Sequence, residues 1–82
     1  LASIEGVRVA LREGGNTIVL HRGSFGSAVI ELQELLIRKG FDISIDGDFG
    51  SATELAIMVV QKNSGLIVDG IVGQNTWNVL RQ

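Results

Sequence analysis

The sequence contains no cysteine and no proline, and it has a single histidine in 82 residues. The absence of cysteine excludes disulfides, thiol catalysis and thiolate-bound zinc. The chain also lacks a cluster of basic residues, with 7 Lys and Arg against 9 Asp and Glu. Nucleic-acid binding is therefore not expected, because neutralising phosphates needs several grouped cations. No apolar run approaches the length of a membrane helix, so we expect no membrane partner either.

A hydrophobic content of 45% with only 20% charged residues indicates a globular chain, and its length allows one domain. Apolar residues with helical spacing mark three segments, 27–39, 51–63 and 74 to the end. Gly40 and Gly65 follow the first two segments, where a left-handed glycine commonly ends a helix. The expected fold class is mainly α, a three-helix bundle.

Trp77 has two possible roles in the third segment. An exposed ring would be a stacking platform for a sugar, whereas a buried ring would belong to the core. Trp77 directly follows Thr76, and Leu80 comes three residues later in helical register. This spacing favours packing in the core.

The N-terminal residues carry a weaker pattern. Residues 7–12 and 17–21 flank a Gly-Gly turn and predict a short β-hairpin, although a helix through residues 4–11 competes with it. The chain begins with Leu1 and looks like a piece of a longer protein. We expect residues 1–19 to be a linker or N-terminal extension, and residues 20–82 to form the domain.

One motif, Asp-Gly-x-x-Gly-x-x-Thr, occurs twice, from Asp46 to Thr53 and from Asp69 to Thr76. In each copy the Asp-Gly pair predicts a tight turn, with the Asp side chain bonding nearby backbone amides. The second glycine is acceptable as a helix N-cap, and the Thr would bond back to that cap. We interpret each copy as a structural turn that ends a loop and starts the helix that follows it.

A calcium-binding loop is a more specific alternative interpretation of the first copy. Residues 42–48 (DISIDGD) fit its first seven positions, but position 12 is Thr53, and Glu54 comes one place late. The second copy has Gly65 and Ile67 where ligands are needed. No lysine follows the glycines as in a phosphate-binding loop. We therefore expect no metal site and no cofactor.

Catalytic residues are equally hard to find. His21 has no recognisable Asp or Ser partner, and we interpret it as a surface or capping residue. Asp46 and Asp48 are in principle an acid/base pair, but in a polar loop they are more simply solvated or capping groups. Glu31 and Glu34 look like a solvated helix face. The chain by itself is not expected to be an enzyme.

The ordered string of motifs over about residues 20–80 resembles the peptidoglycan-binding domain found on many bacterial and phage cell-wall hydrolases. Two departures are conservative: Val60 precedes Gln61 where the family often has Phe, and Ser51 and Gln74 stand where it often has Pro. The string comprises Gly23-Ser24-x-Gly26, Val29-x-x-Leu32-Gln33, Gly40-Phe41, Asp46-Gly47-x-Phe49-Gly50-x-x-Thr53 and Gly65-Leu66-x-x-Asp69-Gly70-x-x-Gly73-x-x-Thr76-Trp77-x-x-Leu80.

The resemblance implies a non-catalytic three-helix module that anchors a covalently linked lytic enzyme, such as an endolysin or autolysin, on peptidoglycan. The ligand would be the glycan strand or its stem peptide, and the location the cell wall, outside the cell or reached by a phage lysin. An alternative is a protein-interaction or structural domain in a phage or secretion assembly, because a fold does not fix a function. The expected contact residues are Asp46, Asp48, Asp69 and Asn75, with Gln33 and Gln61 as amide donors.

Overall fold

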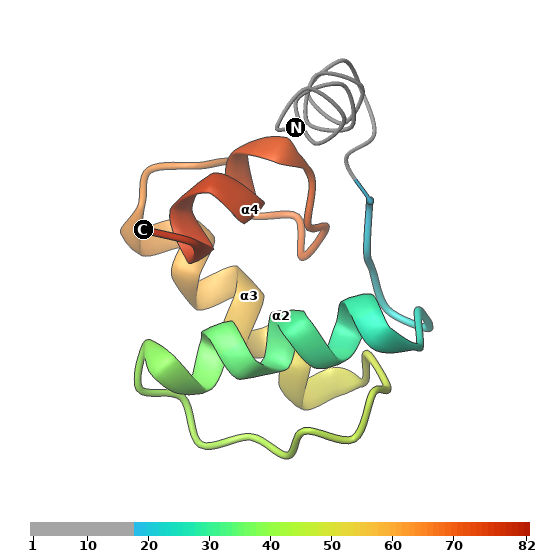
Figure 1. Cartoon of the computed structure of the whole chain (residues 1–82). Helices are drawn as coiled ribbons and strands as arrows, with labels where there is room; N and C mark the ends of the chain where they lie inside the picture. Colours follow the sequence, from blue (N-terminus) through green and yellow to red (C-terminus); the bar gives the residue numbers. More distant parts are fainter. Residues whose placement is uncertain (1–17) are drawn as a thin grey trace, which may run out of the picture.

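The computed structural model describes residues 18–82 and contains three helices in this range: α2 (Ser27–Arg38), α3 (Ser51–Asn63) and α4 (Gln74–Leu80). Each helix contacts the other two. In Figure 1, α2 crosses α3, and α4 lies at the opposite end of α3, joined to it by a loop. The predicted three-helix bundle is confirmed. The predicted N-terminal hairpin depends on residues 7–17, which lie outside the described residues.

The helix ends follow the local sequence. Gly40 has a φ of +103°, and its amide donates to the Ile37 carbonyl at 2.9 Å while the Phe41 amide donates to the Leu36 carbonyl at 3.1 Å. This pair of bonds satisfies carbonyls that the end of α2 leaves free. The end of α3 repeats the arrangement at Gly65, whose φ is +73°. Both predicted glycine caps are confirmed.

The core lies between the three helices and includes Trp77, which is only 3% exposed. Its ring nitrogen Nε1 donates to the Ile18 carbonyl at 2.7 Å, and the Arg81 guanidinium lies 4.4 Å from the ring centroid. Trp77 is therefore a core residue and offers no open stacking face, as its spacing predicted. The other buried apolar residues are Leu20, Val29, Leu32, Leu36, Phe49, Ala56, Ile57, Val60, Val72 and Leu80.

The segment before α2 runs across both copies of the repeated loop. Leu20 exchanges two backbone hydrogen bonds with Val72 in the second copy, at 3.2 and 2.8 Å. A few residues later, the Phe49 amide of the first copy donates to the Ser24 carbonyl at 2.9 Å. One short stretch of chain thus holds the two loops in place relative to each other.

Candidate functional site

Gln33, on the buried face of α2, organises the first repeated loop. Its carbonyl Oε1 accepts hydrogen bonds from the Asp46 and Gly47 amides at 3.1 and 2.9 Å. Its Nε2 lies 3.0 Å from Asp46 Oδ1, 3.0 Å from the Asp48 carbonyl and 3.2 Å from Thr53 Oγ1. The buried side-chain amide of one glutamine therefore forms hydrogen bonds along the whole turn from Asp46 to the start of α3.

Gln61, near the end of α3, does the same for the second loop. Its Oε1 accepts from the Asp69 and Gly70 amides at 3.1 and 2.9 Å. Its Nε2 lies 3.0 Å from Asp69 Oδ1, 2.9 Å from the Ile71 carbonyl and 3.2 Å from Thr76 Oγ1. The two copies thus share one hydrogen-bonding pattern, bond for bond, and we call each of them a glutamine-centred loop.

These clusters correct the predicted role of the two threonines. Thr53 was expected to bond back to the helix cap, but its hydroxyl accepts from Gln33 Nε2 and the Gly50 amide donates to the Asp48 carbonyl. Thr76 accepts from Gln61 in the same way. Both threonines are almost fully buried. Their hydroxyls join the loop to an earlier helix, a long-range contact that a local capping rule does not contain.

Gln33 and Gln61 are each 1% exposed. The two hydrogens of each Nε2 already face three acceptors within the fold. In this structure neither amide has a donor left for a ligand, so the expected role of these two residues as amide donors has no support. Their place in the site is to hold the loops. The sequence signal for this role was that a glutamine recurs on the apolar face of two helices. The signal is weak, because the two glutamines precede their Asp partners by different numbers of residues, 13 and 8.

The other four predicted contact residues, Asp46, Asp48, Asp69 and Asn75, are exposed on the two loops and on the first turn of α4. The Asp46 carboxylate accepts from the Asp48 amide at 3.0 Å and from Gln33. These hydrogen bonds, the Asp48 amide first, lower the pKa of Asp46 below its ordinary value. Asp46 is therefore an anion held in a fixed orientation. Asp69 makes the equivalent bonds to the Ile71 amide and to Gln61.

Each glutamine-centred loop borders a shallow hollow. The first hollow, of about 230 Å³, gathers Gln33, Asp46 and Asp48 beside the start of α3. The second, of about 250 Å³, gathers Gln61, Asp69 and Asn75 beside the start of α4. The six predicted contact residues thus divide into two sets of three, one at each loop.

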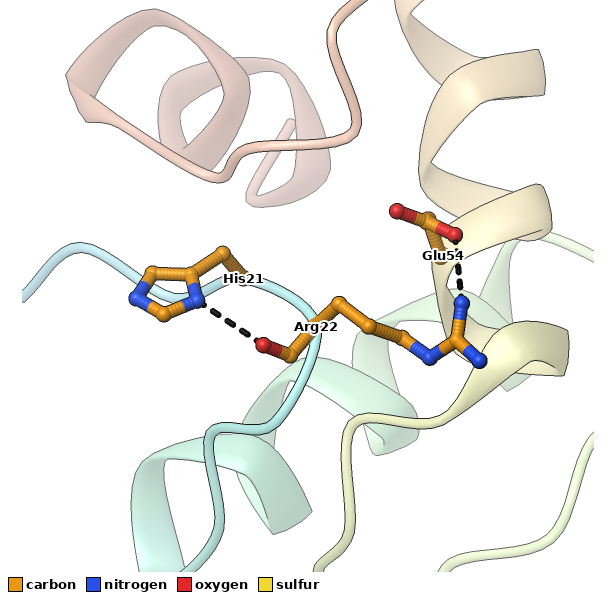
Figure 2. Close-up of polar contacts among 3 residues, drawn as sticks. All are labelled: His21, Arg22 and Glu54. Carbon is orange, nitrogen blue, oxygen red and sulfur yellow. Dashed lines mark hydrogen bonds and ion pairs between the residues drawn. The ribbon is translucent and has the colours of Figure 1, made fainter.

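The imidazole of His21, the one histidine of the sequence, has no carboxylate partner among residues 18–82. His21 is exposed and its Nδ1 lies 2.9 Å from the Arg22 carbonyl, while the Arg22 guanidinium extends away from it to Glu54 on α3 at 3.0 Å (Figure 2). Figure 2 shows that no carboxylate faces the imidazole ring among these three residues. No group of three or more His, Asp or Glu side chains suited to a metal ion occurs in the described part of the chain. None of its helices is long and apolar enough to cross a membrane.

The sequence of this chain is similar to known sequences. Residues 25–80 match a family described as "Putative peptidoglycan binding domain". A probable N-acetylmuramoyl-L-alanine amidase of Bacillus licheniformis is 32% identical over 81 residues, covering 95% of this chain and 23% of the amidase. The type VI secretion system spike protein VgrG3 of Vibrio cholerae is 42% identical over 69 residues, covering 67% of this chain and 7% of VgrG3. The chain therefore spans about a quarter or less of these relatives.

Two solved structures share the fold. An endolysin of the Burkholderia phage AP3 superposes with a TM-score of 0.75 and 43% identity, over 77% of this chain and 24% of the endolysin. The N-terminal domain of SleB superposes with a TM-score of 0.75 and 42% identity, over 78% of this chain and 89% of that domain. The three helices and their loops thus form a unit that also occurs within a larger phage endolysin.

Proposed function

The chain belongs to the peptidoglycan-binding domain family, and we propose that it is a non-catalytic module that anchors a covalently linked lytic enzyme to the bacterial cell wall. The observation that carries this proposal is the family match over residues 25–80, together with the shared fold of the phage endolysin. Tethering raises the local concentration of an enzyme at an insoluble polymer without any chemistry of the module's own. The cell wall is then the place of action.

For the contact surface we propose the exposed residues of the two glutamine-centred loops, Asp46, Asp48, Asp69 and Asn75. Rigidity supports this choice, because a loop that is already ordered loses little entropy when it binds. Gln33 and Gln61 supply that order from inside the fold. In this proposal the two glutamines position the contact residues and do not touch the polymer.

The absence of catalysis in this chain is also a proposal. It is supported by the exposed imidazole of His21, whose Nδ1 is paired with the Arg22 carbonyl and with no carboxylate. It is further supported by Asp46, whose lowered pKa makes it a poor general acid or base near neutral pH. Residues 20–82 would then form the binding domain, and residues 1–19 would lead to a neighbouring domain.

Sedimentation with purified peptidoglycan sacculi tests the proposal. The chain should pellet with sacculi and release no soluble fragments from them. Asp48→Ala should weaken pelleting without lowering the melting temperature, because the Asp48 backbone, and not its side chain, takes part in the loop cluster. Asp42→Ala, an exposed acid outside both hollows, is the matched control and should bind like the wild type.

Each result has a defined meaning. Unimpaired pelleting of Asp48→Ala would move the contact surface away from the first loop. Failure of the wild-type chain to pellet would contradict wall binding and favour the second candidate, a protein-interaction domain in a larger assembly. The observation that supports this second candidate is the similarity to the secretion spike protein VgrG3.

A further inference from the structure

The two hollows have the same backbone framework and different chemistry. Positions 44, 48 and 52 of the first loop correspond to positions 67, 71 and 75 of the second, because both loops make the same bonds to their glutamines. The first hollow presents a hydroxyl, a carboxylate and a methyl group there, from Ser44, Asp48 and Ala52. The second presents two isoleucines and an amide there, from Ile67, Ile71 and Asn75.

Two isoleucines, Ile67 and Ile71, line the second hollow. Ile67 is 81% exposed and Ile71 is 43% exposed, although neither contributes to the core. Exposed apolar residues that adjoin polar ones in a concave surface are typical of a ligand site. The first loop shows that this backbone does not require an apolar residue at either position, since Ser44 and Asp48 occupy the equivalent places. A folding role therefore does not explain the two isoleucines.

We infer that the second hollow binds the acetamido group of an N-acetylated sugar in the glycan strand. This inference rests on the proposed function, because it identifies the part of peptidoglycan that one of the two loops contacts. An acetamido group consists of a methyl group and an amide. The methyl group suits the apolar wall formed by Ile67 and Ile71, and the amide suits the Asn75 side chain, which both donates and accepts hydrogen bonds.

Size and charge support the same ligand. At about 250 Å³ the hollow is smaller than the roughly 300–1,000 Å³ typical of small-molecule pockets, so it suits one sugar with its substituent. Asp69 is the one acidic residue that lines it, whereas Asp46 and Asp48 both line the first hollow. A neutral acetamido group loses less hydration than a charged group when it enters a partly apolar surface. The second hollow therefore suits a neutral ligand group better than the first hollow does.

NMR titration of the ¹⁵N-labelled chain tests the inference with two defined probes. Oligomers of N-acetylglucosamine should shift the amide signals of residues 66–76, and oligomers of glucosamine, which lack the acetyl group, should not. Equal shifts with both oligomers would overturn the inference, and so would shifts confined to residues 44–53 or no shifts at all. Shifts produced only by an alanyl-alanine peptide would assign the hollow to the stem peptide and would also overturn it.

Two variants test the inference further. Each replaces a residue of the second loop with the residue found at the equivalent position of the first loop. Ile67→Ser should weaken binding of the N-acetylated oligomer about fourfold, the value of one methyl-sized apolar contact. Asn75→Ala should weaken it as well. Val68→Ser is the matched control, because Val68 is exposed on the same loop but does not line the hollow. Equal affinities for Ile67→Ser and Val68→Ser would overturn the role of Ile67 in the inference.

The sacculus experiment distinguishes a failure of wall binding from a failure of acetamido binding. If the wild-type chain pellets with sacculi but does not respond to N-acetylated oligomers, wall binding stands and the acetamido inference fails. If the chain neither pellets nor responds, both fail. Pelleting that is reduced in Ile67→Ser and unchanged in Val68→Ser supports both.

Discussion

Gln33 and Gln61 occupy equivalent positions in two hydrogen-bonded clusters. Nε2 of each lies 3.0 Å from Oδ1 of the Asp that opens its loop motif and 3.2 Å from Oγ1 of the Thr at the third position of the following helix. Each Oε1 receives two backbone amides. No buried side-chain polar atom in residues 18–82 lacks a partner. The relationship explains how so small a domain orders two loops without a disulfide.

Gln33→Glu should destabilise the fold strongly. The carboxylate would keep the acceptor for the Asp46 and Gly47 amides but would lose the donor for three acceptors, including the Asp46 carboxylate. Leaving buried polar groups unpaired costs about 1–3 kcal/mol, and a buried charge costs more. Chemical denaturation should therefore show a loss of at least about 2 kcal/mol. Gln82→Glu, at an exposed position, is the control, and similar losses for both would contradict the role of Gln33 in the first glutamine-centred loop.

The stability of the chain should fall in acid through Asp46. Its pKa is lower in the folded protein than in the unfolded chain, so its contribution is present above the ordinary value of 3.8 and is lost as pH falls through the folded pKa. Asp46→Asn should flatten the dependence of unfolding free energy on pH below about pH 4. Asp42→Asn should keep more of the wild-type dependence of unfolding free energy on pH. The idea fails if the two variants have the same acid profile.

Gly40→Val should lower the melting temperature, while Gly50→Ala should change it little. Gly40 has a φ of +103°, which a β-branched residue adopts only with strain of about 1–3 kcal/mol. A Cβ at either glycine meets no atom within 4 Å, and Gly50 has a φ of −100°. The pair therefore separates backbone strain from crowding. Equal melting temperatures for the two variants would contradict the left-handed cap.

Trp77→Ala should unpack the core and cost about 3–5 kcal/mol, the usual range for removing a buried aromatic ring. Trp77 is 3% exposed, so the loss should appear in the melting temperature of the free chain. Leu55→Ala is the comparison, because Leu55 is 63% exposed on α3 and should change stability by no more than about 0.5 kcal/mol. A stable Trp77→Ala chain with impaired wall binding would instead make the ring a contact residue.

Calcium should leave the protein unchanged. The first loop uses Asp46 to accept protein amides, and no cluster of three acidic or histidine side chains suited to a cation occurs among the described residues. Melting curves with millimolar calcium and with a chelator should coincide. A rise of several degrees with calcium alone would restore the calcium-loop interpretation.

The sequence by itself determined the helices, their ends and the existence of two similar loops. These features depend on neighbouring residues: apolar spacing within one helix, a glycine after its last turn, and an Asp-Gly pair before the next. Gly40 and Gly65 were therefore assigned correctly, and α3 begins and ends at the predicted residues. The burial of Trp77 also followed from local spacing.

Tertiary structure alone decided what the loops contact. Gln33 precedes Asp46 by 13 residues and Gln61 precedes Asp69 by 8, so no fixed spacing connects each glutamine to its loop. The polar character of glutamine suggested an exposed donor, but packing buried both amides, because only a complete set of partners makes burial of an amide tolerable. Whether Ile67 and Ile71 belong to the core or to a surface hollow is likewise a property of the folded chain, since apolar character alone does not determine exposure.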